Sequence, residues 1–450
     1  MRSNRARSFG TALTLALALV AAACTDPGEQ GGGPAVPRGS PLVSPDPPPA
    51  TSDGSTSEPR STNPSGPSGP GMSGSPPAPT TAPSDADRRL LVVWVRGELS
   101  PSSVAAVRAV PGVADVASVG EGTLWLTGPP SALGAGAGQG AEIPIDAAAA
   151  DPAALRRVLG DQPWLAALAN GDAVLSDTSA ALRSSGRGDE LQFAGGSTFR
   201  IGAIATDKAV GAHEVFLSAA GGTLLGIGGA DYLLVRLAHD PDPAATERAV
   251  AHAVPASPGH DVRVRSQAQT AYLRQADGVM PPEWTKVYFG EFAATPTPGG
   301  ITIDPAWVRQ NIVTAAVPIL GEVTCNRSLI PPLRAALQAI RDNGDARLVD
   351  PAHYGGCFAE RLIRGSTSQI SQHAYGAAID INVSTNLLGA KPTQDPRVIS
   401  AFHDRGFVWG GGFLLPDGMH FEYGCPAIRQ LPERTNVPEP LAGLALCPVG

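Results

Sequence analysis

Residues 371–382, SQHAYGAAIDIN, decide the fold of the C-terminal region together with residues 417–422, DGMHFE. Asp380 lies in the apolar, strand-like run AAIDI, where burying an unpaired carboxylate costs free energy that a metal partner removes. His373 and His420 complete a set of two imidazoles and one carboxylate. Three such ligands leave a fourth tetrahedral position open to water, which is the arrangement of a catalytic zinc. The two segments therefore predict one zinc ion held by His373, Asp380 and His420.

Asp417 is the residue that this pattern indicates for acid–base chemistry. It lies three residues before His420 on a glycine-containing turn, so a ligand and a second carboxylate would reach the same small volume. Zinc polarises a scissile carbonyl and lowers the pKa of its water, while a carboxylate that is not a ligand takes the water proton and delivers it to the leaving amine. We therefore expect amide hydrolysis with Asp417 as the catalytic base.

The same residues resemble a known family, the zinc D-alanyl-D-alanine carboxypeptidases and related peptidoglycan peptidases of the VanY type. The family pattern is Ser-x-His-x-x-Gly-x-Ala-x-Asp, followed by a carboxylate-x-x-His. The chain meets every fixed position, with Ser371, His373, Gly376, Ala378, Asp380, Asp417 and His420. The flanking segments CFAERLIRGSTSQ and GFVWGGGF are also similar to the family, so the resemblance covers roughly residues 315–425.

The resemblance adds a substrate and two substrate-binding residues to the zinc ligands and the base. The implied substrates are peptidoglycan stem peptides. Ser371 would hydrogen-bond the free carboxylate of such a peptide. Arg361 would hold the same carboxylate or polarise the carbonyl, with Arg364, three residues away, as the alternative arginine.

The exact bond that is cut stays open at the level of sequence. The base is often Glu in the carboxypeptidase and dipeptidase branches of the family, whereas the Asp at position 417 also occurs in endopeptidase-like members. We expect a D-alanyl-D-alanine carboxypeptidase, with an endopeptidase of the same fold as the alternative. A second alternative is a non-catalytic lipoprotein that binds the cell wall or assists a transporter, in which the zinc fold only grips stem peptides.

The length and composition predict how the rest of the chain is organised. A chain of 450 residues exceeds the usual size of a single hydrophobic core, which predicts two folded domains and tails. Residues 25–88 are rich in Pro, Gly, Ser and Thr and too poor in apolar side chains to order, so they predict a disordered tether. An α+β extracytoplasmic domain of unknown role is expected at residues 89–275. Residues 280–450 should form the zinc carboxypeptidase-like domain, also α+β, with a small antiparallel sheet and flanking helices.

Residues 1–24 are expected to be an export signal. Arginines precede an apolar run at residues 11–23 that is too short to span a bilayer. The run ends in AAAC, which resembles a lipobox and implies that Cys24 is diacylated and anchors the protein to a membrane, facing the cell wall. Ordinary cleavage, which would give a secreted protein, is the alternative. Both outcomes place the protein outside the cytoplasm.

Residues 90–255 carry a more diffuse resemblance. LLVVWV predicts a strand, PSSVAAVRAV a helix after Ser100, and TLWLTG another strand. The segments from GDAVLSDTSAALRSSGRG to FRIGAIA and DYLLVRLAHDPDPAATERAVAHAV resemble the extracytoplasmic core domain of ABC-transporter permeases. This implies a binding or spacer role, with an unidentified protein partner. The histidines of this region show no ligand spacing and are expected to be ordinary surface or packing residues.

The cysteines predict disulfides. Beyond Cys24 the chain has four, Cys325, Cys357, Cys425 and Cys447, an even number in a chain bound for an oxidising compartment. Three pairings are open, and we favour Cys325 with Cys357 and Cys425 with Cys447 because neighbours in sequence close the shorter loops. The close Cys-x-x-Cys spacing of structural zinc sites is absent from the sequence.

Two helices are predicted in the C-terminal region. The first has Ser328 as N-cap, two prolines in its first turn, and Leu333, Leu337 and Ile340 on one face, and it ends at Asn343-Gly344. The second runs from about residue 396 to 405 and buries Ile399 and Phe402.

The charge of the chain excludes one class of partner. Its formal net charge is -8 and its pI is about 5.5, and it has no lysine-arginine run outside the extreme N-terminus. The electrostatic footprint of a nucleic-acid binder is therefore missing, and we expect no nucleic-acid partner.

Overall fold

The computed structural model describes residues 85–127, 142–239, 242–255, 262–270, 272–274, 279–298, 300–366 and 368–424. Contacts divide the chain into residues 1–76 and 77–450, and every described residue belongs to the second unit. The predicted export signal, Cys24, the tether up to residue 84, Cys425 and Cys447 lie outside the described residues. The last four residues that the sequence assigned to the tether form helix α1 (Asp85–Arg88) instead, and a 2.7 Å hydrogen bond from the Arg89 side chain to Asp85 spans it.

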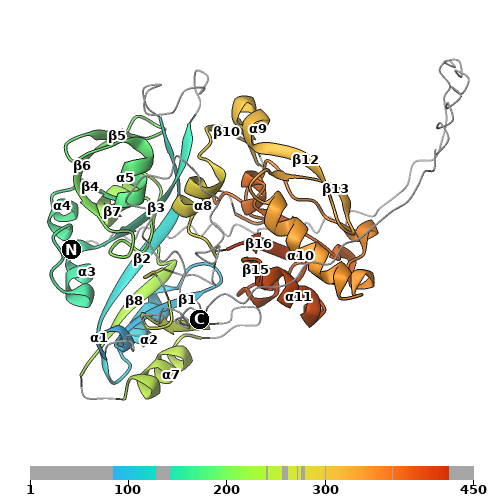
Figure 1. Cartoon of the computed structure of the whole chain (residues 1–450). Helices are drawn as coiled ribbons and strands as arrows, with labels where there is room; N and C mark the ends of the chain where they lie inside the picture. The colour runs from blue at the N-terminus through green and yellow to red at the C-terminus, as the bar shows by residue number, and fades with distance from the viewer. Residues whose placement is uncertain are drawn as a thin grey trace, which may run out of the picture. The chain divides into compact units, whose positions relative to one another are not determined.

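A nine-stranded sheet is the largest element of the structure (Figure 1). Its strand order is β5-β6-β4-β7-β3-β2-β8-β1-β9, and all neighbours are antiparallel except the pairs β3–β7 and β4–β6. The strands are β1 (Leu90–Val95), β2 (Val113–Leu126), β3 (Ile143–Ala150), β4 (Ala173–Ser176), β5 (Glu190–Gln192), β6 (Thr198–Ala205), β7 (Val215–Ser218), β8 (Tyr232–Leu237) and β9 (Val262–Ser266).

The first elements of this region follow the sequence prediction closely. Strand β1 is buried along its whole length, as its apolar sequence requires, and the next helix begins after Ser100, whose hydroxyl accepts the Ser103 N–H. Residues 123–126, TLWL, are not a separate strand but the end of the long strand β2, because the pairing with β3 continues the same strand beyond its pairing with β8. The helices are α2 (Pro101–Arg108), α3 (Pro152–Leu159), α4 (Leu165–Ala169), α5 (Asp177–Arg183), α6 (Ala219–Leu224) and α7 (Pro243–Ala253).

Residues 279–424 hold smaller sheets around a separate apolar core. A three-stranded antiparallel sheet has the order β14-β16-β15, and two hairpins pair β10 with β11 and β12 with β13. The strands are β10 (Ala294–Thr297), β11 (Gly300–Ile303), β12 (Ile312–Val317), β13 (Gly321–Asn326), β14 (Ala378–Asp380), β15 (Phe407–Trp409) and β16 (His420–Tyr423). The predicted α+β class is confirmed, with a small antiparallel sheet near the C-terminus and a separate larger sheet.

Helices flank the small sheet. The α-helices are α8 (Pro282–Phe289), α9 (Pro305–Asn311), α10 (Ile330–Asp342) and α11 (Pro396–His403), and the 3-10 turns are η1 (Ala346–Leu348), η2 (Pro351–His353), η3 (Gln372–Tyr375), η4 (Val383–Thr385) and η5 (Gly410–Gly412). In α11, Phe402 is fully buried as predicted and packs on Phe421 of β16 with ring centroids 4.4 Å apart, while Ile399 is only partly buried. None of the described helices has the length and apolar character that crossing a membrane requires.

The start of α10 corrects one prediction. The N-cap is Leu329 rather than Ser328, and no side chain caps this end. A capping hydroxyl accepts the N–H of the second or third helical residue, and Pro331 and Pro332 occupy those positions without an N–H. The Ser328 N–H itself is bound by the side chain of Asn326 at 3.0 Å. The predicted apolar face and the end at Asn343 are confirmed.

Candidate metal centre

The small sheet brings two of the predicted ligands together. Strands β14 and β16 are antiparallel, and their register places Asp380 directly opposite His420. Both residues are buried, with 4% and 8% of their surface exposed. A strand pair therefore joins residues that are 40 positions apart in the chain.

The third predicted ligand comes from the turn η3, just before β14. Ser371 is the N-cap of this turn, and its hydroxyl accepts the His373 N–H. The turn ends at Gly376, whose φ of 62° is left-handed and whose missing Cβ would lie 2.5 Å from the Asn326 nitrogen. The Ser-x-His-x-x-Gly spacing is thus the sequence of one capped turn that fixes the position of His373.

The three predicted ligands converge on one point. His420 Nδ1 lies 3.0 Å from Asp380 Oδ1 and 3.2 Å from His373 Nε2, and the third side, from His373 Nε2 to Asp380 Oδ1, is 3.3 Å. Tetrahedral zinc with bonds of about 2.0–2.1 Å separates its ligand atoms by about 3.3 Å. These three residues form a group that could hold a metal ion, and their spacing fits zinc.

The outer ring nitrogens are held by acceptors that orient the lone pairs inward. His373 Nδ1 donates to the Cys357 carbonyl at 2.7 Å, and His420 Nε2 donates to Glu422 at 3.0 Å. Each acceptor keeps a proton on the outer nitrogen, so a metal that displaces the proton of the inner nitrogen would meet a lone pair already directed at the centre of the group. Sequence reasoning missed both partners. Glu422 lies two positions after His420 on one strand, and that i, i+2 spacing puts both on the same face.

The electrostatics of the group favour a bound cation. Burial raises the pKa of Asp380, but the hydrogen bonds with His373 and His420 outweigh it and hold this pKa far below its usual range. Burial would lower the pKa of His420, but its hydrogen bonds with Asp380 and Glu422 raise it to about 10. Two buried carboxylates beside the rings thus stabilise positive charge at this position.

Asp417 is half-buried at the turn before β16. Its carbonyl accepts the His420 N–H at 3.1 Å, its own N–H donates to Gly410, and its Oδ1 is buried without a hydrogen-bond partner among the described residues. Burial raises the pKa of its carboxyl, and the charges of His420 and Asp380 also act on it. Asp417 therefore lies within electrostatic reach of the three predicted ligands without belonging to their group, and its role as a base stays a prediction.

The two candidate arginines differ in burial. Arg361 is half-buried, and burial lowers its pKa, while Arg364 is exposed. The charges of Asp380 and Asp417 act on Arg361, and that of Arg364 acts on Asp417, so both lie within electrostatic reach of the site. The Arg361 carbonyl accepts the Ser371 N–H at 3.3 Å, which joins the arginine segment to the ligand turn. The substrate roles of Arg361 and Ser371 stay predictions.

The predicted disulfide between Cys325 and Cys357 is confirmed, with Cα atoms 5.4 Å apart. It ties the segment at Cys357 to strand β13. The same segment accepts the His373 ring proton and pairs with β14, since Gly356 forms a bridge with Asp380. The disulfide therefore supports the backbone that holds two of the three predicted ligands.

Comparison with known proteins agrees with this site. Residues 364–423 match the family model of D-alanyl-D-alanine carboxypeptidases. The matched segment includes His373, Asp380, Asp417 and His420 but begins after Arg361. No curated protein matches the chain.

Solved structures are also similar to a part of the chain. One is the periplasmic region of MacB from Actinobacillus actinomycetemcomitans, with 10% identity, 40% of this chain and 89% of that chain covered, and a TM-score of 0.30. Another is the extracellular domain of the noncanonic ABC-type transporter YknZ from Gram-positive bacteria, with 11% identity, 39% of this chain and 99% of that chain covered, and a TM-score of 0.29.

Replacing Glu422 by Gln should weaken zinc binding by about 10–100-fold, the usual effect of removing the partner of a metal-binding histidine. The neutral amide accepts the His420 proton more weakly and can also donate, so the ring loses its fixed orientation. Competition with a chromophoric zinc chelator measures the affinity. Glu322→Gln, at an exposed carboxylate on β13, is the matched control. Equal affinities for the two variants would show that Glu422 does not orient the ligand.

Proposed function

We propose that the protein is a zinc-dependent peptidase that hydrolyses peptidoglycan stem peptides, and that it acts as a D-alanyl-D-alanine carboxypeptidase. The observation that carries this proposal is the buried triangle of His373 Nε2, Asp380 Oδ1 and His420 Nδ1, with sides of 3.0–3.3 Å. The family match over residues 364–423 and the position of Asp417 beside the triangle support it.

Each residue of the site has one role in the proposed reaction. His373, Asp380 and His420 hold the zinc ion, which supplies polarisation of the scissile carbonyl and a more acidic water. Asp417 accepts the proton of the attacking water and returns it to the leaving amine. Its raised pKa suits both transfers, because a base with a higher pKa both accepts and delivers a proton near neutral pH.

The substrate is held by charge. The free carboxylate of a stem peptide would pair with Arg361 and accept a hydrogen bond from Ser371, both on segments joined to the ligand turn. Arg364 is the alternative arginine. Because a carboxypeptidase must recognise a chain end, a cationic residue beside the site favours removal of a terminal D-alanine over an internal cut.

The location of the protein is part of the proposal. The N-terminal sequence supports export and a lipid anchor at Cys24, with secretion as the alternative, so the substrate would be the cell wall outside the membrane. The region of the nine-stranded sheet, residues 90–266 (the large-sheet region), would serve as a spacer or as the binding site of a protein partner.

The test uses residues 25–450 purified without the export signal and incubated with a muropeptide whose pentapeptide stem ends in D-Ala-D-Ala. Mass spectrometry should show loss of one D-alanine, which stops after chelation and returns when zinc is added. A cross-linked muropeptide dimer in a parallel reaction detects an internal cut, which would replace the carboxypeptidase by the endopeptidase. Intact substrates in the presence of one bound zinc would favour the binding lipoprotein.

A further inference from the structure

Helix α8 has two faces with different partners. Trp284, Tyr288 and Phe289 pack into the apolar core of residues 279–424. Glu283 and Lys286 are also buried, with 0% and 2% exposed, yet their polar atoms contact residues of the large-sheet region. The helix thus belongs to the core that carries the metal centre and is held from its other side by charges.

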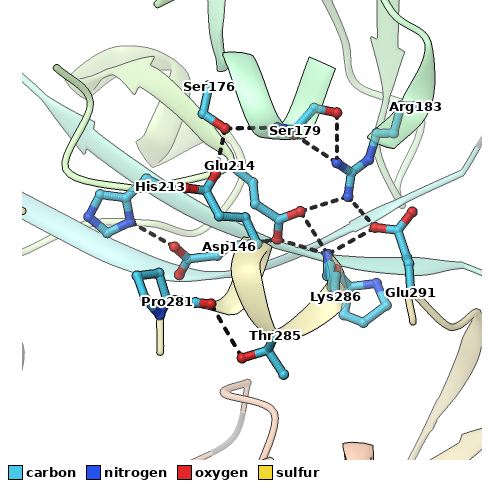
Figure 2. Close-up of polar contacts among 12 residues, drawn as sticks. Asp146, Ser176, Ser179, Arg183, His213, Glu214, Pro281, Thr285, Lys286 and Glu291 are labelled. Carbon is cyan, nitrogen blue, oxygen red and sulfur yellow. Dashed lines mark hydrogen bonds and ion pairs between the residues drawn. The ribbon is translucent and has the colours of Figure 1, made fainter. Parts of the chain in front are cut away.

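The charged side chains around Lys286 form a buried set that we name the Glu214 cluster: Glu214, Arg183, Lys286 and Glu291 (Figure 2). Lys286 Nζ lies 2.8 Å from both Glu214 oxygens and 3.2 Å from Glu291, and Arg183 Nη2 lies 2.7 Å from Glu214 and also contacts Glu291. The two positive and two negative charges of the cluster sum to zero.

The Glu214 cluster is also hydrogen-bonded to the large sheet. The Asp146 N–H on β3 donates to Glu214 at 2.8 Å, and Lys286 Nζ donates to the Pro144 carbonyl. The side chains of Glu214, Arg183 and Lys286 are at most 3% exposed. Charges this deeply buried hold only one geometry, because a displaced partner leaves a charge without compensation. The cluster therefore fixes α8 relative to β3.

Helix α8 is in turn joined to the ligand turn η3 at both of its ends. Near its start, Thr285 Oγ1 accepts from Gln372 Nε2 at 3.2 Å and donates to the Pro281 carbonyl at 3.3 Å. At its end, the Asn326 amide donates at 3.1 Å both to the Phe289 carbonyl and to the Tyr375 carbonyl. Gln372 and Tyr375 are the first and last residues of η3, so these bonds bracket His373.

We propose that Thr285 and Lys286 are positioning residues for the zinc ligand His373, through a path that runs from the large sheet to the Glu214 cluster, to α8 and to η3. The proposal rests on the proposed function, in that it treats His373 as a ligand. It makes the large-sheet region a structural part of the peptidase rather than a separable spacer, because residues 280–450 alone would leave Lys286 without Glu214 and Arg183.

The sharpest test is Thr285→Val, which keeps the shape and removes the hydroxyl that Gln372 contacts. We expect zinc affinity, measured on residues 25–450 by chelator competition, to fall about tenfold, the size of effect seen when a group that orients a ligand is lost. Thr246→Val on α7 is a matched control. Thr246 is also buried, and its hydroxyl donates to the Asp242 carbonyl four residues earlier, as Thr285 does to Pro281.

The control separates positioning from stability, since both variants lose the same intrahelical hydrogen bond. Equal zinc affinities for Thr285→Val and Thr246→Val, with the wild type binding zinc, would overturn the positioning role. Failure of the proposed function would give a different result. If the wild type binds zinc but releases no D-alanine, the proposed function fails, while the zinc affinities of the two variants still test the positioning role. A wild type that binds no zinc would overturn both proposals.

Two substitutions test Lys286, one that removes its charge and one that keeps it. Lys286→Met leaves Arg183 as the one cation that Glu214 and Glu291 share within the Glu214 cluster, so that two carboxylates face a single positive charge, and we expect a lower unfolding temperature together with weaker zinc binding. Lys286→Arg retains the charge and should restore part of the zinc affinity. A lower unfolding temperature for Lys286→Met with unchanged zinc affinity would show that the Glu214 cluster only stabilises the fold.

Discussion

His420→Ala should lose zinc and reduce hydrolysis of the pentapeptide muropeptide by about a thousandfold or more. One of three ligands is removed, and the polarisation that a metal supplies is worth several kcal/mol of transition-state stabilisation, at about 1.4 kcal/mol per tenfold in rate. The zinc content of the purified protein and the rate of D-alanine release are the two measurements. His373→Ala should behave in the same way, because the two rings lie 3.2 Å apart at their inner nitrogens.

The control for this prediction is His403→Ala, at an exposed histidine on α11. It should retain zinc and activity. His420→Ala also deprives the buried carboxylates of Asp380 and Glu422 of a partner, so its unfolding temperature is measured in parallel, and the comparison is made on folded protein. Stoichiometric zinc in folded His420→Ala, or hydrolysis at the wild-type rate, would remove His420 from the metal centre.

The ligand group could be predicted from sequence because local structure encodes most of it. Ser371 and Gly376 delimit one turn, and an apolar run that contains a single carboxylate indicates a buried strand end. His420 could be predicted from the short Asp-x-x-His motif that begins at Asp417. Only the register between β14 and β16 depends on residues that are far apart in the sequence. That register agrees with the motif, because it pairs Asp380 with His420.

Other features left no local signal in the sequence. The Cys357 carbonyl contacts His373 through the backbone, which any residue type provides. Glu214 and Lys286 are 72 positions apart, and each in isolation has the sequence appearance of an ordinary surface charge. The N-cap of α10 was predicted wrongly for a local reason: the helix begins one residue later, after Leu329, and Pro331 and Pro332 then leave its second and third positions without an N–H for any capping side chain.

Asp417→Asn should keep zinc bound while hydrolysis falls by about 10²–10⁴-fold, the usual contribution of a general base. The amide has the shape of the carboxylate but cannot accept the water proton. Burial disfavours the charged carboxylate here, as its raised pKa shows, so a neutral side chain should leave the unfolding temperature at pH 7 unchanged or higher. Zinc content, unfolding temperature and D-alanine release are measured on the same preparation.

This variant also separates the enzyme from the binding lipoprotein. If the protein only grips stem peptides, Asp417→Asn should retain zinc, stem-peptide binding and any effect on the cell wall, because no step would require a base. If it is a peptidase, stem-peptide binding should persist while D-alanine release and the effect on the cell wall are lost together. The amide side chain of Asp417→Asn cannot take a proton, but it leaves the neighbouring His420 in place. An activity near that of the wild type would therefore exclude Asp417 as the base without bearing on the three metal ligands.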